Sequence, residues 1–288
     1  MAENQVPYRL VVLGAGVMGA GITALAVGHG VSVTLVDVDE DKAGRAREQI
    51  EDQLRMARLM NALPAGRDPG DLTVTTTPEA AAGAGVVIEA VTELLDAKVK
   101  ALAQVSATVS PGTALVSNTS SIPIDELADA VDRPEDLVGA HFMNPPYLIP
   151  MVEVARGPRT ADRTMDAVTS LLTALGRQPV VVGDGPGFVT SRILHRMIND
   201  AVRVVEEGRA TPEAVDTLMR GCLGHRTGPL RTADLIGLDN LADSLRVLYE
   251  RTGDEGCRPC TLLLDKVAQG DLGRKSGRGF YDYGEAMP

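Results

Sequence analysis

Three glycines at fixed spacing directly follow a short apolar run near the start of the chain. The run is Arg9–Leu13, and Gly14, Gly16 and Gly19 after it form the pattern GxGxxG. Between a strand and a helix, the first glycine permits a tight turn, the second lets the backbone approach a pyrophosphate, and the third lets helix and strand pack closely. We therefore expect an α/β sheet whose first turn binds a dinucleotide, with the amides of a helix N-terminus facing the phosphates.

The residues after the turn continue this pattern. Ala20–His29 is Ala-rich and predicts a helix, Val31–Val36 predicts a second strand, and Asp37 ends that strand 18 residues after Gly19 (37 minus 19). An acidic residue near this distance binds the ribose hydroxyls. Its charge repels a 2′-phosphate, so the pattern favours NAD over NADP. The alternative role for Asp37 is to cap the long helix predicted over Asp39–Met60.

Two polar features follow further predicted strands. The strand at 114–117 leads into SNTSS, residues 117–121, and the strand at 137–140 ends at His141. Open α/β sheets bind ligands at the carboxyl ends of their strands, so we expect both features on the nucleotide side. The alternatives are a helix-capping turn for SNTSS and a buried histidine held by a backbone carbonyl. Other strands are predicted at 72–75, 86–89, 151–155 and 179–182.

The segment HFMNPPYLIPMVE, residues 141–153, begins with an imidazole and ends with a carboxylate. His141 is a side chain that gains or loses a proton near neutral pH, and Glu153 can hold it in one tautomer. Prolines at 145, 146 and 150 remove backbone donors and exclude an ordinary helix. We predict a strand end, a rigid loop at the mouth of a cleft and a new strand, which brings His141 and Glu153 face to face.

Helical spacing dominates the second part of the chain. GDGPG, residues 183–187, marks a turn-rich boundary. Beyond it, Val189–Glu207 has apolar residues at a period near 3.6, Thr211-Pro212 starts another helix, and Leu235–Leu248 predicts a third. The fold class is therefore an α/β, Rossmann-like doubly wound domain over residues 1–184, followed by an all-α domain over residues 185–288.

Composition excludes several kinds of partner. A net charge of −11 argues against nucleic acid and anionic membranes as partners. The chain has no apolar run of about 18 residues and no visible secretory signal, so we expect a cytoplasmic protein. The three cysteines, Cys222, Cys257 and Cys260, are odd in number in a chain without a visible signal, so we expect no disulfide framework. Cys257 and Cys260 have CxxC spacing but no further ligands nearby, so we predict no metal site.

Together the motifs resemble those of the 3-hydroxyacyl-CoA dehydrogenase family. They are GAGVMGAGI at 14–22, IEAVTE at 88–93 with Lys98, SNTSS at 117–121, HFMNP at 141–145 with Glu153, GDGPGF at 183–188 and GRKSGRGFYDY at 273–283. The resemblance implies NAD-linked interconversion of a 3-hydroxyacyl thioester and its 3-oxo form. It also implies a homodimer formed through the C-terminal helical domain.

The resemblance also assigns roles to particular residues. It implies that His141 is the general base or acid, that Glu153 is its partner, and that Ser120 donates a hydrogen bond to the reacting oxygen. Positioned acid–base groups typically contribute about 10²–10⁴-fold to a rate. The implied cofactor contacts are Gly14, Gly16, Val17, Met18, Gly19, Asp37, Glu93, Lys98, Asn118, Asn144 and Lys275. The implied substrate contacts are Ser120, Asn144 and Ser191.

The sequence departs from the family pattern in three places. Ser191 stands where the family has a substrate-facing asparagine, and Pro146–Ile149 replaces a run of small residues. The stretch after the Asp39–Met60 helix is short, and arginines, among them Arg58 and Arg67, stand where family lysines meet CoA phosphates. These departures are similar to a branch that acts on short hydroxyacyl groups, such as glyceryl or seryl, held on an acyl carrier protein in polyketide extender-unit biosynthesis. Both CoA and a carrier protein remain open as the carrier.

Two other functions fit part of the pattern. A β-hydroxyacid dehydrogenase of the 6-phosphogluconate type shares the glycine turn, but relies on a lysine in the helical domain. The helix predicted over Val189–Glu207 contains no lysine. A catalytically inactive NAD-binding scaffold would also keep the turn, although His141, Glu153 and Ser120 are all present and argue against it.

Overall fold

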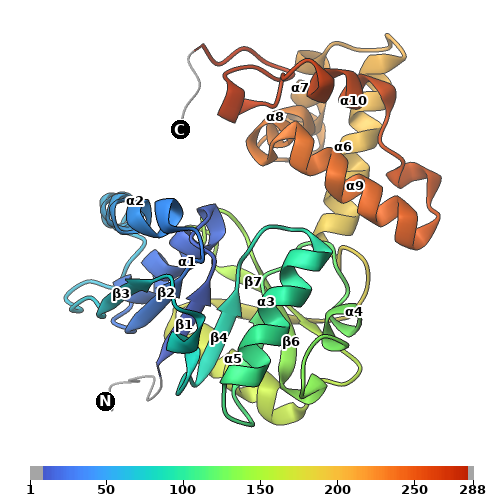
Figure 1. Cartoon of the computed structure of the whole chain (residues 1–288). Helices are drawn as coiled ribbons and strands as arrows, with labels where there is room; N and C mark the ends of the chain where they lie inside the picture. The colour runs from blue at the N-terminus through green and yellow to red at the C-terminus, as the bar shows by residue number, and fades with distance from the viewer. Residues whose placement is uncertain (1–8, 285–288) are drawn as a thin grey trace. The chain divides into compact units, whose positions relative to one another are not determined.

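The computed structural model describes residues 9–284, and the chain divides into two compact units between Gly185 and Pro186 (Figure 1). Unit 1, which ends at Gly185, combines a sheet with helices, and unit 2 is helical. Across the described residues, no helix is both long and apolar enough to cross a membrane.

Unit 1 is organised around one sheet with the strand order β3-β2-β1-β4-β5-β6-β7-β8. Within the described part of the chain, neighbouring strands are parallel except β6 and β7, which are antiparallel. The chain winds outward from β1 to β3, returns beside β1 to form β4, and then winds the other way. This is the doubly wound order, which binds ligands where the direction reverses. The strands are β1 Leu10–Leu13, β2 Val33–Val36, β3 Leu72–Thr75, β4 Val86–Glu89, β5 Ala114–Ser117, β6 Leu137–Phe142, β7 Met151–Arg156 and β8 Gln178–Gly183.

Helices cover the sheet of unit 1. They are α1 Val17–Gly28, α2 Glu40–Leu59, α3 Leu95–Thr108, α4 Ile124–Ala128 and α5 Asp162–Ala174, with 3-10 turns η1 Pro78–Ala81 and η2 Pro134–Asp136. Residues of α1, α2 and α5 form one apolar cluster with the sheet, whereas α3 packs against α4 (Figure 1). Strands β1, β2, β4 and β5 are buried along their whole length. A strand covered on both faces carries a continuous apolar run, which explains why these segments show no alternation.

Several boundaries in unit 1 differ from those predicted by one to three residues. Helix α1 begins at Val17 rather than Ala20, so Gly19 lies inside the helix. Helix α3 begins at Leu95, so Glu93 lies in the loop between β4 and this helix. Strand β6 continues through Phe142, which places His141 within the strand rather than just after it.

Unit 2 is built from helices around a second apolar cluster. Thr211 caps α7 by accepting a hydrogen bond from the Ala214 amide, with Pro212 at the first helical position, as predicted. The single helix predicted over Leu235–Leu248 is wrong, because Gly237 adopts a φ of 95° and separates two helices. The helices are α6 Thr190–Glu206, α7 Pro212–Leu223, α8 Pro229–Ile236, α9 Leu238–Thr252 and α10 Thr261–Ala268, with 3-10 turns η3 Glu255–Cys257 and η4 Arg274–Ser276.

Candidate active site

His141 and Glu153 face each other across the one antiparallel strand pair in the described sheet. The register of β6 and β7 places these two residues directly opposite, and Nδ1 of His141 lies 3.2 Å from Oε2 of Glu153. Both side chains are buried. A carboxylate at Nδ1 favours the tautomer that carries its proton there, so Nε2 holds the basic lone pair. The arrangement has the parts of a general base and the group that orients it.

The SNTSS loop at the end of β5 wraps around the carboxylate of Glu93. Oε1 of Glu93 accepts hydrogen bonds from the Thr119 hydroxyl at 2.6 Å, the Ser120 amide at 2.7 Å and the Ser120 hydroxyl at 3.2 Å. It also accepts from the amide and hydroxyl of Ser121, both at 3.0 Å. The half-buried Ser120 hydroxyl is thereby held at the carboxyl end of β5, next to the strand that carries His141.

A buried ammonium group lies beneath this loop. Nζ of Lys98 lies 2.8 Å from Oε1 of Glu89 and 3.2 Å from Oε2 of Glu93. Burial opposes ionisation of Glu93, but Lys98 and the loop hydrogen bonds outweigh it and lower the pKa of that carboxyl. Burial likewise opposes the charge on Lys98, and the two carboxylates outweigh it and raise the pKa of the ammonium group. The three side chains therefore form an ionised group that ties the ends of β4 and β5 together.

The glycine turn has the shape that a dinucleotide requires. Gly14 adopts a φ of 98°, and a Cβ there would lie 2.7 Å from the Ala90 carbonyl oxygen. A Cβ at Gly19 would lie 1.8 Å from the carbonyl oxygen of Gly14, so α1 can approach the turn only because this residue is glycine. A Cβ at Gly16 would meet no atom within 4 Å, and the open space is where a pyrophosphate approaches the backbone.

Asp37 is held at the end of β2 by backbone amides. Its Oδ2 accepts a hydrogen bond from the Ala15 amide at 2.7 Å, and its Oδ1 accepts one from the Asp39 amide at 3.0 Å. The cap of α2 is Asp39, which accepts from the Lys42 amide. Asp37 is thus oriented beside the glycine turn and does not serve as the helix cap. Its position and charge, with the open turn, fit the ribose of an NAD molecule.

Family comparisons agree with this geometry. Residues 9–185 match the family model described as 3-hydroxyacyl-CoA dehydrogenase, NAD binding domain, and residues 187–283 match the C-terminal domain of the same enzymes. The chain belongs to the 3-hydroxyacyl-CoA dehydrogenase family. The prediction of an NAD-dependent dehydrogenase, with a Rossmann-like domain followed by a helical one, is confirmed.

Members of this family are similar over nearly their whole length. A probable 3-hydroxybutyryl-CoA dehydrogenase of Bacillus subtilis is 41% identical over 284 residues, covering 96% of this chain and 98% of the relative. The mitochondrial hydroxyacyl-coenzyme A dehydrogenase of Homo sapiens is 32% identical over 292 residues, which cover 98% of this chain and 93% of the relative. Among solved structures, (S)-3-hydroxybutyryl-CoA dehydrogenase PaaH1 from Ralstonia eutropha has a TM-score of 0.87 at 37% identity, covering 96% of this chain and 99% of that one.

The remaining residues that the family resemblance singles out have different environments. Asn118 is buried, and its Oδ1 accepts from the Phe142 amide at 2.9 Å, which joins the ends of β5 and β6. Asn144 is exposed in the loop after β6. In unit 2, Ser191 is buried in the first turn of α6, and Lys275 forms an ion pair with Asp239 at 2.6 Å. In the first turn of α1, Val17 is exposed and Met18 is half-buried.

Sequence reasoning missed several members of the site. Glu89 is fully buried, and it binds Lys98, the Ser117 hydroxyl at 2.6 Å and the Val91 amide at 2.8 Å. The hydroxyls of Thr119 and Ser121 anchor Glu93 together with Ser120. The available signal was an acidic residue at the end of a wholly apolar strand, which is unusual because a buried carboxylate needs partners.

Proposed function

We propose that this enzyme interconverts a short-chain 3-hydroxyacyl-CoA and the corresponding 3-oxoacyl-CoA, with His141 as the general base and acid. The supporting observation is the contact between Nδ1 of His141 and the Glu153 carboxylate. In the oxidation, the 3-hydroxyl gives its proton to Nε2 of His141 as the carbon–oxygen bond becomes a carbonyl. NAD held at the glycine turn would supply the acceptor for the hydride that leaves C3. Glu153 stabilises the resulting imidazolium, and the reverse reaction returns the same proton.

Ser120 has a separate role in this proposal. Its backbone amide donates to Glu93 and keeps the residue at the carboxyl end of β5, and in the substrate complex its hydroxyl turns from Glu93 and donates to the oxygen at C3. Such a donor stabilises negative charge that develops on that oxygen during hydride transfer. The cofactor contacts proposed above, from the glycine turn to Asp37, hold NAD at the reversal point of the sheet.

CoA is the carrier that we propose, because the relatives named above act on CoA thioesters. The decisive assay follows NADH absorbance with 3-hydroxybutyryl-CoA in parallel with glyceryl or seryl groups on an acyl carrier protein. Faster turnover of the CoA thioester supports the proposal. Turnover only of the carrier-bound groups would reassign the enzyme to extender-unit chemistry, and no turnover of either would favour an inactive scaffold.

The role of His141 is tested by His141→Asn, which removes the base and keeps a polar side chain of similar size. We expect kcat to fall by about 10²–10⁴-fold. The Kd for NAD should stay within about twofold, because a base acts mainly in the transition state. His29→Asn is the matched control, since His29 is equally buried and bonds only a backbone carbonyl among its described contacts. Equal losses in both variants would contradict the assignment.

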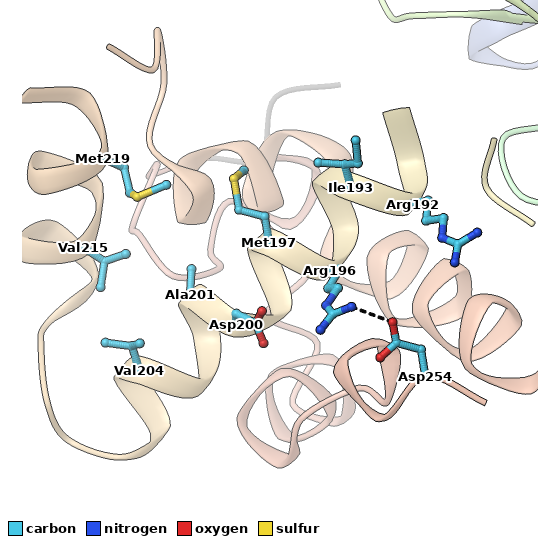
Figure 2. Close-up of a pocket in the computed structure, with 10 residues that line it drawn as sticks. All are labelled: Arg192, Ile193, Arg196, Met197, Asp200, Ala201, Val204, Val215, Met219 and Asp254. Atoms are coloured by element: carbon cyan, nitrogen blue, oxygen red, sulfur yellow. Dashed lines mark hydrogen bonds and ion pairs between the residues drawn. The ribbon is translucent and has the colours of Figure 1, made fainter. Parts of the chain in front are cut away.

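We further propose that unit 2 forms a homodimer through a groove along α6 and α7. Figure 2 shows the apolar side chains Ile193, Met197 and Val204 of α6 and Val215 and Met219 of α7 along this groove. Ile193 is 63% exposed, and it lies with other apolar side chains in one groove, which is typical of an interaction surface. Ile193→Glu should convert a dimer to a monomer in light scattering after size exclusion, and an unchanged mass would refute this interface.

A further inference from the structure

The loop that joins β6 to β7 has few backbone hydrogen bonds of its own. It spans residues 143–150, and the prolines at 145, 146 and 150 offer no N–H. Within the loop, the amides of Leu148 and Ile149 both donate to the Pro145 carbonyl, at 3.0 and 3.3 Å. Other carbonyls of the loop must find donors elsewhere, because an unpaired buried carbonyl is costly.

Arg177, which lies between α5 and β8, supplies those donors. Its Nη1 lies 3.2 Å from the Pro146 carbonyl oxygen, 3.4 Å from that of Tyr147 and 3.1 Å from that of Ile149. The neighbouring backbone amide of Gln178 donates to the Pro150 carbonyl at 2.7 Å. One guanidinium group and one amide therefore bind four carbonyls of the loop, those of Pro146, Tyr147, Ile149 and Pro150.

The charge of Arg177 has no carboxylate partner among the described residues. Its Nε donates to the Leu175 carbonyl at 3.1 Å, so each of its hydrogen-bond partners in residues 9–284 is a carbonyl oxygen. Burial lowers the pKa of this half-buried guanidinium group. An arginine keeps its charge at neutral pH nonetheless, and its planar fork is suited to several acceptors at once.

The loop fixes which residues of β6 and β7 face each other. His141 is two residues before the loop and Glu153 is three residues after it, so the length and shape of the loop bear directly on their register. A slip of one residue would turn the Glu153 side chain to the opposite face of the sheet. On the side of α1, Pro146 packs so closely against Gly21 that a Cβ there would lie 2.9 Å from the proline ring. Arg177 binds the carbonyl of the same Pro146, so the loop is held between α1 and Arg177.

We propose that Arg177 is a positioning residue for the reaction, and that its guanidinium group clamps the 143–150 loop so that Glu153 stays in contact with the His141 imidazole. The inference rests on the proposed role of His141. Arg177 touches neither substrate nor cofactor in this scheme, and acts through the loop carbonyls. A displacement of about 1 Å in a reacting group can cost about 10²-fold in rate.

The test compares Arg177→Ala with Arg133→Ala. Arg133 is the control, because it also donates to two backbone carbonyls, those of Ser106 and Val109, at the far end of α3. It pairs with the buried Asp136 as well, so its loss is the more severe test of stability. We expect Arg177→Ala to lower kcat by about 10- to 100-fold, with a change in Kd for NAD of less than about threefold. Arg177→Lys should retain part of the wild-type kcat. Added ethylguanidinium should raise the kcat of Arg177→Ala and leave that of Arg133→Ala unchanged.

A second measurement does not depend on activity. Hydrogen exchange at the amides of Leu148 and Ile149 should accelerate in Arg177→Ala and remain at the wild-type rate in Arg133→Ala. The inference is overturned if exchange at these amides is unchanged, if kcat of Arg177→Ala stays within about threefold of wild type, or if Arg133→Ala loses as much. An inactive wild-type enzyme would refute the proposed function, and the exchange experiment would still decide whether Arg177 holds the loop.

Discussion

Lys98 offers a sharp test of the ionised group beneath the SNTSS loop. Lys98→Met removes the ammonium group and keeps an unbranched apolar chain on α3. The carboxylates of Glu89 and Glu93 then face each other without a cation. Breaking a buried ion pair by removing one partner typically costs about 3–5 kcal/mol. We expect the lower end, about 3 kcal/mol, because the Glu93 side chain is 36% exposed and Glu89 keeps its Ser117 partner.

This cost is large enough to measure in a protein of this size. For a unit of about 180 residues, each kcal/mol corresponds to a shift in Tm of about 2–4 °C. Lys98→Met should therefore lower the Tm of unit 1 by about 6–12 °C in differential scanning calorimetry. Lys100→Met is the control, since Lys100 is exposed on the same helix and its loss should change stability by less than about 0.5 kcal/mol.

The double variant separates charge from packing. Adding Glu89→Gln to Lys98→Met removes an uncompensated charge, so the double variant should regain more than about 1 kcal/mol relative to Lys98→Met alone. A Tm for Lys98→Met within about 2 °C of wild type would refute the reasoning. The ends of β4 and β5 would then be held by their backbone ladder and not by the buried charges.

Three further outcomes follow from the site. Gly19→Ala should weaken NAD binding more than about tenfold in calorimetric titration, because its Cβ would overlap the Gly14 carbonyl; unchanged affinity would show that the turn can shift. Asp37→Asn keeps an acceptor for the Ala15 amide but loses the negative charge. The ratio of kcat/KM with NAD to kcat/KM with NADP should therefore fall by about tenfold. An unchanged ratio would contradict the contact between Asp37 and the ribose. The pKa of Glu93 is lower in the folded state, so this carboxylate adds stability above its unfolded pKa, near 4.5, and the added stability is lost as the pH falls through the folded pKa. Glu93→Gln should therefore flatten the dependence of the unfolding free energy on pH below about 4.5. Parallel curves for the variant and the wild type would exclude this linkage.

The acyl group and a cytoplasmic location stay predictions. Ser191, one of the implied substrate contacts, is buried in the first turn of α6. Cys257 and Cys260 are free and buried, and burial raises the pKa of both thiols, which makes them poor nucleophiles. Neither cysteine therefore competes with His141 as a reactive group.

Local patterns in the sequence determined the class of fold, the cofactor turn and the pairing of His141 with Glu153. The glycine turn, the apolar runs at β4 and β5, and the helical period of α6 each depend on residues that are close in the chain, so their conformations are encoded locally. The pairing of His141 with Glu153 was also predictable, because a short proline-rich loop leaves two strands little choice but to lie side by side. Asp37 followed from a fixed distance along one strand–turn–helix–strand unit.

Only the tertiary structure decided how those residues are held. Ser117 and Glu89 are 28 positions apart, and Arg177 lies 28 positions from the nearest loop carbonyl that it binds. No periodicity links such residues, because parallel strands brought together by the sheet need not be close in sequence. The break at Gly237 was missed for a related reason: the apolar period continues across it, and the left-handed φ that stops the helix is visible only in three dimensions.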